Sequence, residues 1–564
     1  MVLLLLGFGG IMATAHELAN IIFPDITDTI DDLEKQFPPR KLKTGAMVTR
    51  FAPSPTGFLH TGSLFTSLIA RKVASDSQGV FFTRLEDTDS KREIVGAGNL
   101  LLKELKAFGI EPDEGYLGDQ QCGDYGPYVQ SQRANIYKIV IKSMIERDLA
   151  YPCFCTPEEL SEMRNRQEQS KVIPGYYGPY AHCRFIPQEE ALERIKNNEP
   201  YVIRFKSPGN HNHKIKVIDL IRGKMELTEN DQDIIIMKSD GLPTYHFAHI
   251  VDDHFMRTNC VTRGEEWLSS LPIHIQLFES LGWEAPGYAH LPVINKLDNG
   301  NKRKLSKRKD PEAAVSFFIE KGYPLEAVNT YLLSIANSNF EEWWAQNKSQ
   351  SLDQFKFSFS KMSLDGALFD LDKVNYFAKE ILGLLDAETI SNRALIWAKS
   401  YYADFASLIE SNFVYFVSIM GIERGIAKPR KDYSTFSDIY PAIKFFYRPF
   451  YIELTNSELP FNPNIESLVI KESLNDVLKA TDFSLDEHDW FESLKQIASR
   501  HQFAPSGKLY KANPADYVGN IGDFAEILRV ALTGSRQSPN LYYIIQVLGP
   551  EEFAFRIKYV IEKL

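Results

Sequence analysis

The sequence has few cysteines, no excess of basic over acidic charge, and no apolar run long enough to cross a bilayer. Five cysteines in 564 residues cannot build a disulfide framework, and the odd number leaves one unpaired, which favours a reducing compartment. The net charge is −11, so the chain is not a general nucleic-acid coat, and any contact with nucleic acid requires local basic patches. A hydrophobic content of 44% with 24% charged residues excludes disorder and a collagen-like chain.

The N-terminal stretch from residue 2 to residue 15 is apolar but too short to span a membrane. Its end fits a signal-peptide cleavage pattern, yet no lysine or arginine precedes it, since the first is Lys35. Six acidic residues that follow also argue against a mitochondrial transit peptide. We interpret Met12 as the translation start and residues 1–11 as a leader artefact. We therefore expect a cytoplasmic protein without a membrane contact.

A β-α-β unit is predicted after residue 46. Residues 47–52 form a β-rich run that two prolines and a glycine terminate by residue 57. Apolar residues then recur with helical spacing from Phe65 to Val73, and a second β-rich run covers residues 80–85. Such a unit predicts a parallel sheet, with ligands at the carboxyl ends of its strands.

The loop before the predicted helix presents His60 and Gly62. A helix N-terminus carries free amides and partial positive charge, which suit a phosphate group. Gly62 permits close approach of a ligand to the backbone, and His60 can donate to phosphate oxygens. The alternative is that His60 caps the helix and Gly62 ends a turn, because a lone His-x-Gly is a weak signal.

A basic loop, residues 301–310, interrupts this acidic protein. It follows a glycine-bearing turn at residues 297–300 and precedes a helix-like stretch, residues 313–319, so we expect a structured loop. Its lysines can neutralise a triphosphate and stabilise the charge that develops at phosphorus. A nuclear-localisation signal is the alternative interpretation of the same composition.

Several segments together resemble a class I aminoacyl-tRNA synthetase. His60-Thr61-Gly62-Ser63 resembles the HIGH signature of that class, and Lys304-Leu305-Ser306-Lys307-Arg308 resembles its KMSKS loop. The run from Arg50 to Gly57, RFAPSPTG, resembles the opening signature of bacterial-type glutamyl-tRNA synthetases, whereas glutaminyl enzymes typically carry Pro-Glu-Pro-Asn-Gly there. Further similar segments lie at residues 84–89, 241–246, 251–254 and 263–267, and the resemblance covers about residues 47–345.

The resemblance implies a two-step reaction in which glutamate attacks the α-phosphorus of ATP and the adenylate is then transferred to the 3′ end of tRNA(Glu). Mg²⁺ is expected to accompany ATP, which is a substrate. Whether tRNA(Gln) is also charged with glutamate stays open. The implied catalytic residues are His60, Gly62, Lys304, Ser306 and Lys307. The implied ATP-binding residues are His60, Gly62, Glu266, Lys304, Leu305, Ser306, Lys307 and Arg308.

A glutamate pocket needs two cationic groups for two carboxylates and one anionic group for the ammonium. Arg50 and Arg263 are the candidate cations and Glu86 is the candidate anion, although a surface ion pair is the simpler reading of each arginine alone. Which arginine takes the side-chain carboxylate stays open. With the residues that the resemblance adds, the expected wall is Arg50, Phe51, Ala52, Ser54, Glu86, Tyr245, His249, Arg263 and Trp267. His249 departs from the family, because many relatives have asparagine there.

Zinc is a candidate bound metal, because some relatives of the resembled family bind it through a Cys-x-Cys pair and further ligands later in the chain. Cys153, Cys155 and Cys183 match three positions, but Phe185 stands where a fourth ligand is expected. His182 is a substitute that strains a tetrahedral site, so ordinary thiols are the alternative. We interpret the acidic run at residues 252–254 as structural, because adjacent residues rarely face one ion.

The expected fold is an α/β Rossmann-like catalytic domain with a parallel sheet and an inserted α+β acceptor-binding domain, followed by all-α helical bundles. The chain is divided into residues 1–46 (leader and extension), 47–145 (first catalytic half), 146–235 (inserted acceptor-stem-binding domain), 236–290 (second catalytic half), 291–385 (stem-contact region with the lysine loop) and 386–564 (helical anticodon-binding domains). A monomer is expected.

Three other functions remain open: a short paralogue that glutamylates a modified tRNA base, another HIGH-type nucleotidyltransferase, and a non-catalytic tRNA-binding paralogue. Over 200 residues past the lysine loop argue against the first, because that paralogue lacks the anticodon domain. The RFAPSPTG run argues against the second, and intact His60, Gly62, Lys304 and Lys307 argue against the third.

Overall fold

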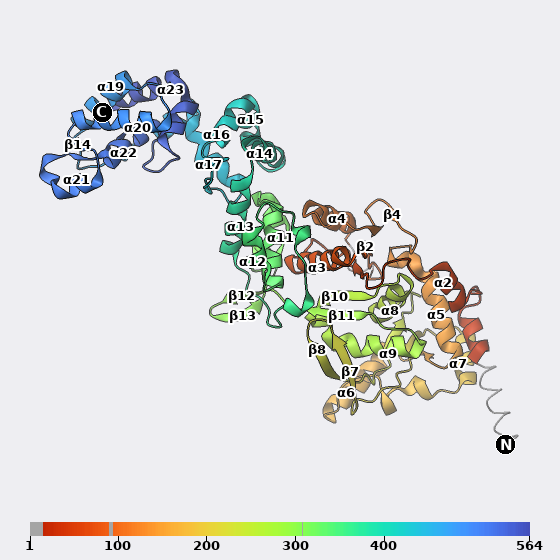
Figure 1. Cartoon of the computed structure of the whole chain (residues 1–564). Helices are drawn as coiled ribbons and strands as arrows, with labels where there is room; N and C mark the ends of the chain where they lie inside the picture. The colour runs from red at the N-terminus through yellow and green to blue at the C-terminus, as the bar shows by residue number, and fades with distance from the viewer. Residues whose placement is uncertain (1–14, 90–93, 307) are drawn as a thin grey trace. The chain divides into compact units, whose positions relative to one another are not determined.

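The computed structural model describes residues 15–89, 94–306 and 308–564, which divide into two compact units (Figure 1). Unit 1 comprises the chain up to Phe317 together with Asn329–Asp370, and unit 2 comprises Phe318–Val328 with Leu371–Leu564. The interpretation of Met12 as the start concerns residues outside the described ones, as does the role predicted for Lys307. Among the helices of the described chain, none combines the length and apolar character of a bilayer span.

The predicted β-α-β unit is confirmed as the start of the first sheet of unit 1. Its strands are β1 (Val48–Phe51), β2 (Val80–Thr83), β3 (Glu114–Tyr116) and β4 (Gln121–Cys122), in that order across the sheet. The β1–β2 and β2–β3 pairs are parallel, and the long helix α3 (Thr61–Ser77) makes the crossover between β1 and β2. Every residue of β1 is buried, as expected for a parallel strand covered on both faces.

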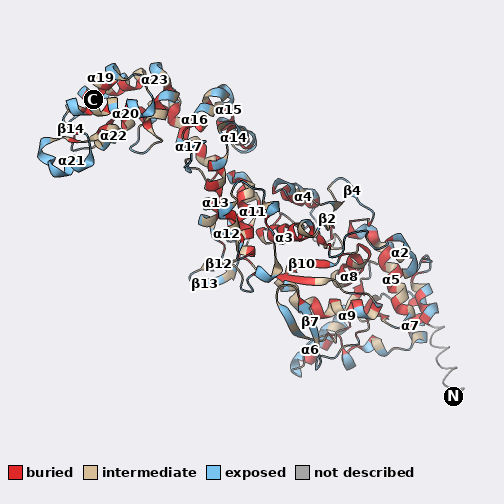
Figure 2. Ribbon diagram, viewed as in Figure 1, coloured by how far each residue is buried: buried red, intermediate tan, exposed pale blue. Residues whose placement is uncertain are grey.

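A second sheet has the order β10-β11-β7-β8, with β10 (Cys260–Gly264) parallel to β11 (Gly287–Leu291). β11 also pairs with β7 (Lys214–Asp219), which forms an antiparallel hairpin with β8 (Gly223–Thr228). β10 lies beside β1, because the amide of Asn259 donates to the carbonyl of Val48 at 3.2 Å. Both α3 and β10 are largely buried (Figure 2). The carboxyl ends of β1, β2 and β10 therefore meet at one edge.

The inserted region folds as α+β, as expected. Its antiparallel sheet consists of β5 (Ala150–Cys153), β6 (Val202–Phe205) and β9 (Ile235–Met237). The other helices of unit 1 are α2 (Ile30–Gln36), α4 (Ala97–Ala107), α5 (Ala134–Glu146), α6 (Pro157–Gln169), α7 (Gln188–Lys196), α8 (Tyr245–Phe255), α9 (Leu271–Leu281) and α12 (Phe340–Gln346). The basic loop begins in a hairpin of β12 (Asn295–Asp298) and β13 (Asn301–Lys304).

The acidic segment before residue 46 is packed into unit 1. Residues 15–22 are helical, and Leu18, Phe23 and Phe37 belong to the same buried core as α5 and α8. Thr29 and Asp32 form a capping box that starts α2. This part of the predicted extension is thus a layer of the catalytic unit, which its charge did not indicate.

Unit 2 is helical, as the apolar spacing after residue 320 predicts. Its main helices are α13 (Leu371–Leu384), α14 (Ala387–Tyr401), α15 (Ala403–Ser411), α16 (Phe413–Met420), α17 (Ile439–Ile443), α18 (Arg448–Leu454), α19 (Ser467–Ala480), α20 (Glu487–Arg500), α21 (Gly507–Ala512), α22 (Ile521–Thr533) and α23 (Leu541–Lys563). Two short parallel strands, β14 (Phe503–Ala504) and β15 (Gly519–Asn520), interrupt this helical region. The boundaries between the units fall in α10 (Ser316–Lys321), in α11 (Leu325–Ala336) and directly before α13, between Asp370 and Leu371. The finer domain boundaries given above stay predictions.

Candidate active site

A cavity of about 1120 Å³ lies where the carboxyl ends of β1, β2 and β10 meet. Parallel α/β sheets bind ligands at this edge. Residues from both motif-bearing segments line it, with His60 and Gly62 from the first and Lys304 from the second. Of the expected glutamate wall, the lining residues are Arg50, Phe51, Ala52, Ser54, Glu86, Tyr245, Arg263 and Trp267. Glu266, from the expected ATP set, also lines the cavity.

His60 caps α3 and faces the cavity as well, so both sequence interpretations of this residue apply. Its Nδ1 accepts a hydrogen bond from the Gly62 amide at 2.9 Å, which leaves the proton of a neutral ring on Nε2. A Cβ atom added at Gly62 would lie 3.2 Å from His60 Nδ1, so a side chain there would displace the ring. The N-terminus of a helix of 17 residues, with His60 as its cap, thus lies at the cavity.

The segment that follows the basic loop, residues 312–315, is anchored beside the His60 turn. Thr61 donates its hydroxyl to the carbonyl of Glu312 at 2.7 Å, and the amide of Val315 donates to the carbonyl of Leu59 at 3.2 Å. His60 forms a bridge with Ala314. The two motif-bearing segments, about 240 residues apart in the chain, are therefore neighbours.

Within the loop, Lys304 reaches the cavity and its Nζ lies 3.3 Å from a carboxylate oxygen of Glu266. Leu305 is buried and its amide donates to the carbonyl of Ile294, while the Ser306 amide donates to Asp310 at 2.9 Å. Leu305, Ser306 and the exposed Arg308 belong to the described chain but do not line the cavity. The loop backbone is thus fixed, with Lys304 as its described contact with the cavity.

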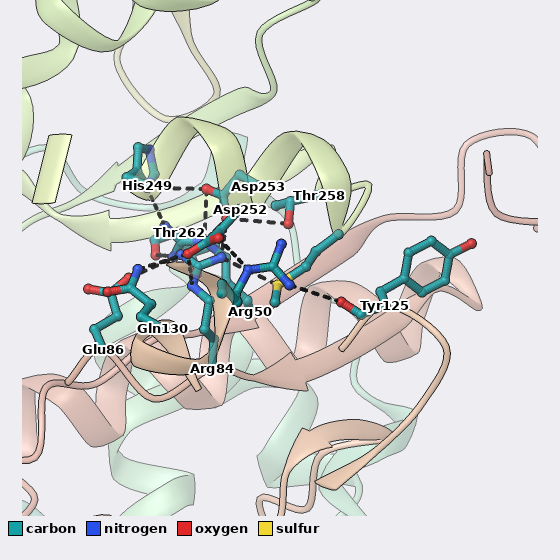
Figure 3. A network of polar contacts seen from close by, with 12 residues as sticks. Arg50, Arg84, Glu86, Tyr125, Gln130, His249, Asp252, Asp253, Thr258 and Thr262 are labelled. Carbon is teal, nitrogen blue, oxygen red and sulfur yellow. Dashed lines mark hydrogen bonds and ion pairs between the residues drawn. The ribbon is translucent and has the colours of Figure 1, made fainter. Parts of the chain in front are cut away.

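Arg50 and Glu86 of the cavity lining belong to a network of buried arginines and acids (Figure 3). Arg50 Nε lies 3.3 Å from both carboxylate oxygens of Asp253, and Arg84 donates to Asp253 at 2.8 Å and to Glu86 at 3.0 Å. Burial raises the pKa of Glu86, although Arg84 and Arg50 oppose the shift. The charge of Arg50 is therefore already matched by a carboxylate of the protein.

Asp252, Asp253 and His254 of α8 all have partners within the protein. Asp252 accepts from Arg133 at 2.6 Å and from Tyr137 at 2.9 Å, Asp253 pairs with the two arginines just described, and His254 pairs with Glu34 at 2.7 Å. Asp252 and Asp253 share Arg84, whose Nε lies 3.5 Å from Asp252 and whose Nη1 lies 2.8 Å from Asp253, whereas His254 has a different partner. They are not among the clusters of possible metal ligands in the described chain.

Arg263 differs from Arg50 in its partners. Its guanidinium donates to His290 Nε2 at 3.0 Å, to His274 Nδ1 at 3.0 Å and to the carbonyl of Trp267 at 3.3 Å. It also lies over the ring of Tyr288, 4.7 Å from the centroid. Within the described chain, no carboxylate forms an ion pair with Arg263, and burial lowers its pKa. Among the described residues of the cavity wall, Arg263 is thus a buried cation without an acid partner.

His249, expected in the glutamate wall, lies behind it. The ring is fully buried, with Nδ1 3.4 Å from Arg50 Nη2 and Nε2 3.2 Å from the Tyr288 hydroxyl. Burial and the nearby arginines hold the pKa of His249 well below its usual value. Sequence reasoning assigned no role to the buried residues that contact the site arginines, Glu86 or His249, which are Arg84, His274, Tyr288 and His290, or to Asp219 beside His290. A buried histidine or tyrosine in an apolar stripe carries no pattern that separates it from an ordinary core residue.

The three cysteines of the inserted region form a cluster. Their Sγ atoms lie within 4.8 Å of one another, and the hydroxyl of Tyr176 lies 3.4 Å from Cys153 Sγ and 3.3 Å from Cys155 Sγ. His182, the fourth ligand that the sequence offered, is exposed. Tyr176 is a fourth donor that spacing alone did not suggest.

Comparison with known families agrees with this fold. Residues 46–373 match the family described as tRNA synthetases class I (E and Q), catalytic domain, and residues 515–561 match an anticodon binding domain. The chain therefore belongs to the class I tRNA synthetases, and the expected fold class is confirmed.

Its similarity to curated proteins narrows the family. It is 45% identical to a glutamate–tRNA ligase of Clostridium beijerinckii over 538 residues, which cover 95% of this chain and 97% of that protein. It is also 45% identical to one of Clostridium perfringens over 543 residues, with 96% and 100% covered. A crystal structure of a glutamate tRNA ligase from Elizabethkingia meningosepticum in complex with its amino acid matches with a TM-score of 0.74 and 29% identity, covering 92% of this chain and 100% of that one. The chain belongs to the glutamate–tRNA ligase family.

Proposed function

We propose that this protein is an ATP-dependent glutamate–tRNA ligase that activates L-glutamate and transfers it to tRNA(Glu). Membership of the family supports the activity. The observation that carries the proposal is a single cavity with His60, Gly62 and Lys304 among its lining residues, together with Arg263 and Glu86. Phosphate-binding groups and groups for an amino acid with two carboxylates therefore share one space.

ATP takes the part of the cavity lined by His60, Gly62 and Lys304. The amides at the start of α3 and the imidazole N–H of His60 receive phosphate oxygens, and Lys304 supplies a positive charge. Leu305, Ser306, Lys307 and Arg308 complete the proposed ATP-binding loop, with Glu266 in the wall. Mg²⁺ would enter with ATP and would supply further positive charge to the phosphates beside Lys304.

Glutamate takes the part lined by Arg263, Glu86, Tyr245 and Trp267. Arg263 receives a carboxylate because it has no acid partner within the described chain, whereas Glu86 receives the ammonium. The rings of Tyr245 and Trp267, 4.4 Å apart between centroids, form an apolar wall. Arg50, Phe51, Ala52 and Ser54 close the pocket, and His249 supports Arg50 from behind.

The chemistry needs no protein nucleophile. An α-carboxylate oxygen of glutamate attacks the α-phosphorus of ATP, the bond to the β-phosphate breaks, and pyrophosphate leaves. A hydroxyl of the terminal ribose of tRNA then attacks the adenylate carbonyl and AMP leaves. Positioning of the reactants and stabilisation of phosphate charge account for the catalysis.

The test is glutamate-dependent exchange of pyrophosphate into ATP, measured with and without tRNA, for the natural protein and for Lys304→Ala. We expect exchange by the natural protein and a loss of about 100-fold or more for the variant, as is typical when a transition-state donor is removed. Absence of exchange by the natural protein in both conditions would favour the non-catalytic paralogue. Charging of purified tRNA(Glu) and tRNA(Gln) with glutamate then decides whether the second tRNA is also a substrate.

We also propose a structural zinc site at Cys153, Cys155, Cys183 and Tyr176. Three thiolates and one oxygen donor suit zinc, and the cluster joins β5 to the segment around residue 180. Metal analysis of the purified protein should give about one zinc per chain. Cys155→Ser should lose the metal and lower the melting temperature, whereas the matched Cys122→Ser, at an exposed cysteine outside the cluster, should retain it. If the natural protein contains no zinc, the three cysteines are ordinary thiols and the proposed site is wrong.

The state and location of the protein are proposed as well: a monomer in the cytoplasm. Light scattering after size-exclusion chromatography tests the first, since a dimer would double the expected mass. Microscopy of a tagged chain tests the second.

A further inference from the structure

We propose that His274 and His290 are positioning residues that hold Arg263 through neutral acceptors, so that the carboxylate partner of this cation is the bound substrate. The inference rests on the proposed glutamate site and deepens it. It concerns two residues outside the cavity lining, on α9 and β11. Both side chains are fully buried.

The hydrogen bonds fix the protonation state of His290. Arginine only donates, so His290 Nε2 must accept from Arg263 Nε and carries no proton. The ring proton therefore sits on Nδ1, which donates to Asp219 at 2.7 Å. Asp219 also accepts from the amides of Ile221 and Arg222 at 2.9 and 2.8 Å. The neutral imidazole of His290 thus stands between Arg263 and the carboxylate of Asp219.

His274 repeats the arrangement on the other side of the guanidinium. Its Nδ1 accepts from Arg263 Nη1 at 3.0 Å, so its proton sits on Nε2 and donates to His246 Nδ1 at 3.0 Å. Burial, with the neighbouring His249 and Arg263, holds the pKa of His274 well below its usual value. Two imidazoles therefore satisfy the geometry of Arg263 without neutralising its charge.

The two arginines of the cavity show what this arrangement achieves. Arg50 has a carboxylate partner in Asp253, so a ligand carboxylate must compete with an acid of the protein. Arg263 meets no such competitor within the described chain. A buried cation without a counter-ion is unfavourable, and an anionic ligand removes that penalty when it binds. The imidazoles thus keep Arg263 oriented and available.

A matched pair of substitutions at His274 tests the proposal. The oxygen of an asparagine or an aspartate can take the place of Nδ1 and accept from Arg263. The two side chains have nearly the same shape, but aspartate adds a negative charge where asparagine has an NH2 group. We expect His274→Asn to keep the KM for glutamate within about threefold, and His274→Asp to raise it by about tenfold or more, because the new carboxylate occupies Arg263. The KM for ATP should change in neither variant.

Controls separate this role from simple packing. His213→Asn and His213→Asp, at an exposed histidine, should leave both KM values unchanged and so exclude a general charge effect. His290→Gln should retain glutamate binding better than His290→Leu, because only glutamine supplies an acceptor for Arg263.

Two outcomes overturn the inference: an equal rise of the glutamate KM in the His274 pair, or an unchanged KM in His274→Asp. If the natural protein activates no glutamate at all, the proposed function fails instead. The two failures are therefore distinct.

Discussion

At the scale of single residues, the cavity depends on two carboxylates that do not line it. Asp252 and Asp253 on α8 are fully buried and hold three arginines, Arg50, Arg84 and Arg133. Buried charges persist only when paired and hydrogen-bonded, so loss of either acid leaves a guanidinium uncompensated. The two acids thus hold in place the arginines at and behind the proposed glutamate wall.

Asp252→Asn should therefore be strongly destabilising. Removing one partner of a buried pair costs about 3–5 kcal/mol of unfolding free energy. Arg71→Gln is the matched control, because the Arg71–Asp113 pair is partly exposed and such pairs contribute about 1 kcal/mol or less. Denaturant unfolding of both variants checks the expectation, and equal losses would contradict it.

Gly62 is a second position where a small change, the addition of a Cβ atom, should affect the site. A methyl group there would approach His60 Nδ1 at 3.2 Å and shift the ring that faces the phosphate position. We expect Gly62→Ala to lower kcat for pyrophosphate exchange by about tenfold or more, since small misplacements of catalytic groups are costly. Gly507→Ala, where a Cβ meets no atom within 4 Å, should leave kcat unchanged. A Gly62→Ala variant with natural kcat would exclude His60 from the reaction.

At the scale of elements, the lysine loop is closed by one acid. Asp310 accepts from Arg303 at 2.6 and 2.9 Å and from the Ser306 amide at 2.9 Å, so it ties strand β13 to the segment that follows the loop. Hydrogen bonds from Arg303 hold the pKa of Asp310 well below its usual value. That segment is in turn bonded to the His60 turn. The loop and the helix N-terminus therefore form one assembly.

Breaking this tie should slow the ATP step more than glutamate binding. Asp310→Asn should lower kcat for exchange by about tenfold while the KM for glutamate stays unchanged, because loop closure limits many reactions of this kind. Asp148→Asn is the control, at an exposed ion pair with Lys206 where the backbone has a positive φ that asparagine tolerates. A larger effect on the glutamate KM than on kcat would contradict the assignment.

At the scale of the whole molecule, buried histidines couple stability to pH. Burial lowers the pKa of five imidazoles in unit 1, those of His246, His249, His254, His274 and His290. In the unfolded chain they titrate near pH 6.5, at about the value of free histidine. As the pH falls below that value, the unfolded chain takes up protons that the folded chain does not. The free energy of unfolding must then decrease.

We therefore expect the melting temperature to fall as the pH is lowered from 7.5 to 5.5. The free energy of unfolding should decrease by up to about 1.4 kcal/mol per pH unit for each such histidine. Calorimetry across this range measures it, and His249→Asn should reduce the slope because one titrating group is removed. A melting temperature that rises on acidification would show that these rings are charged in the folded protein.

Much of the site was predictable from local sequence. The strand, turn and helix from residue 47 to residue 77 follow from apolar spacing and from the prolines and glycine of RFAPSPTG. His60 and Gly62 are placed by that helix start, and the lysine loop is marked by its charge. Short-range conformational preferences determine these features, so they can be predicted from the local sequence alone.

What the sequence by itself determined is therefore the motifs, their local structure and the family. The tertiary structure alone decided which arginine keeps a free charge, that Tyr176 joins the cysteines, and that the acidic N-terminal segment is packed against α5 and α8. Arg50 and Asp253 are 203 residues apart, and Arg263 is held by rings from two other elements. Such pairings depend on how distant elements pack, and no periodicity or spacing along the chain encodes them.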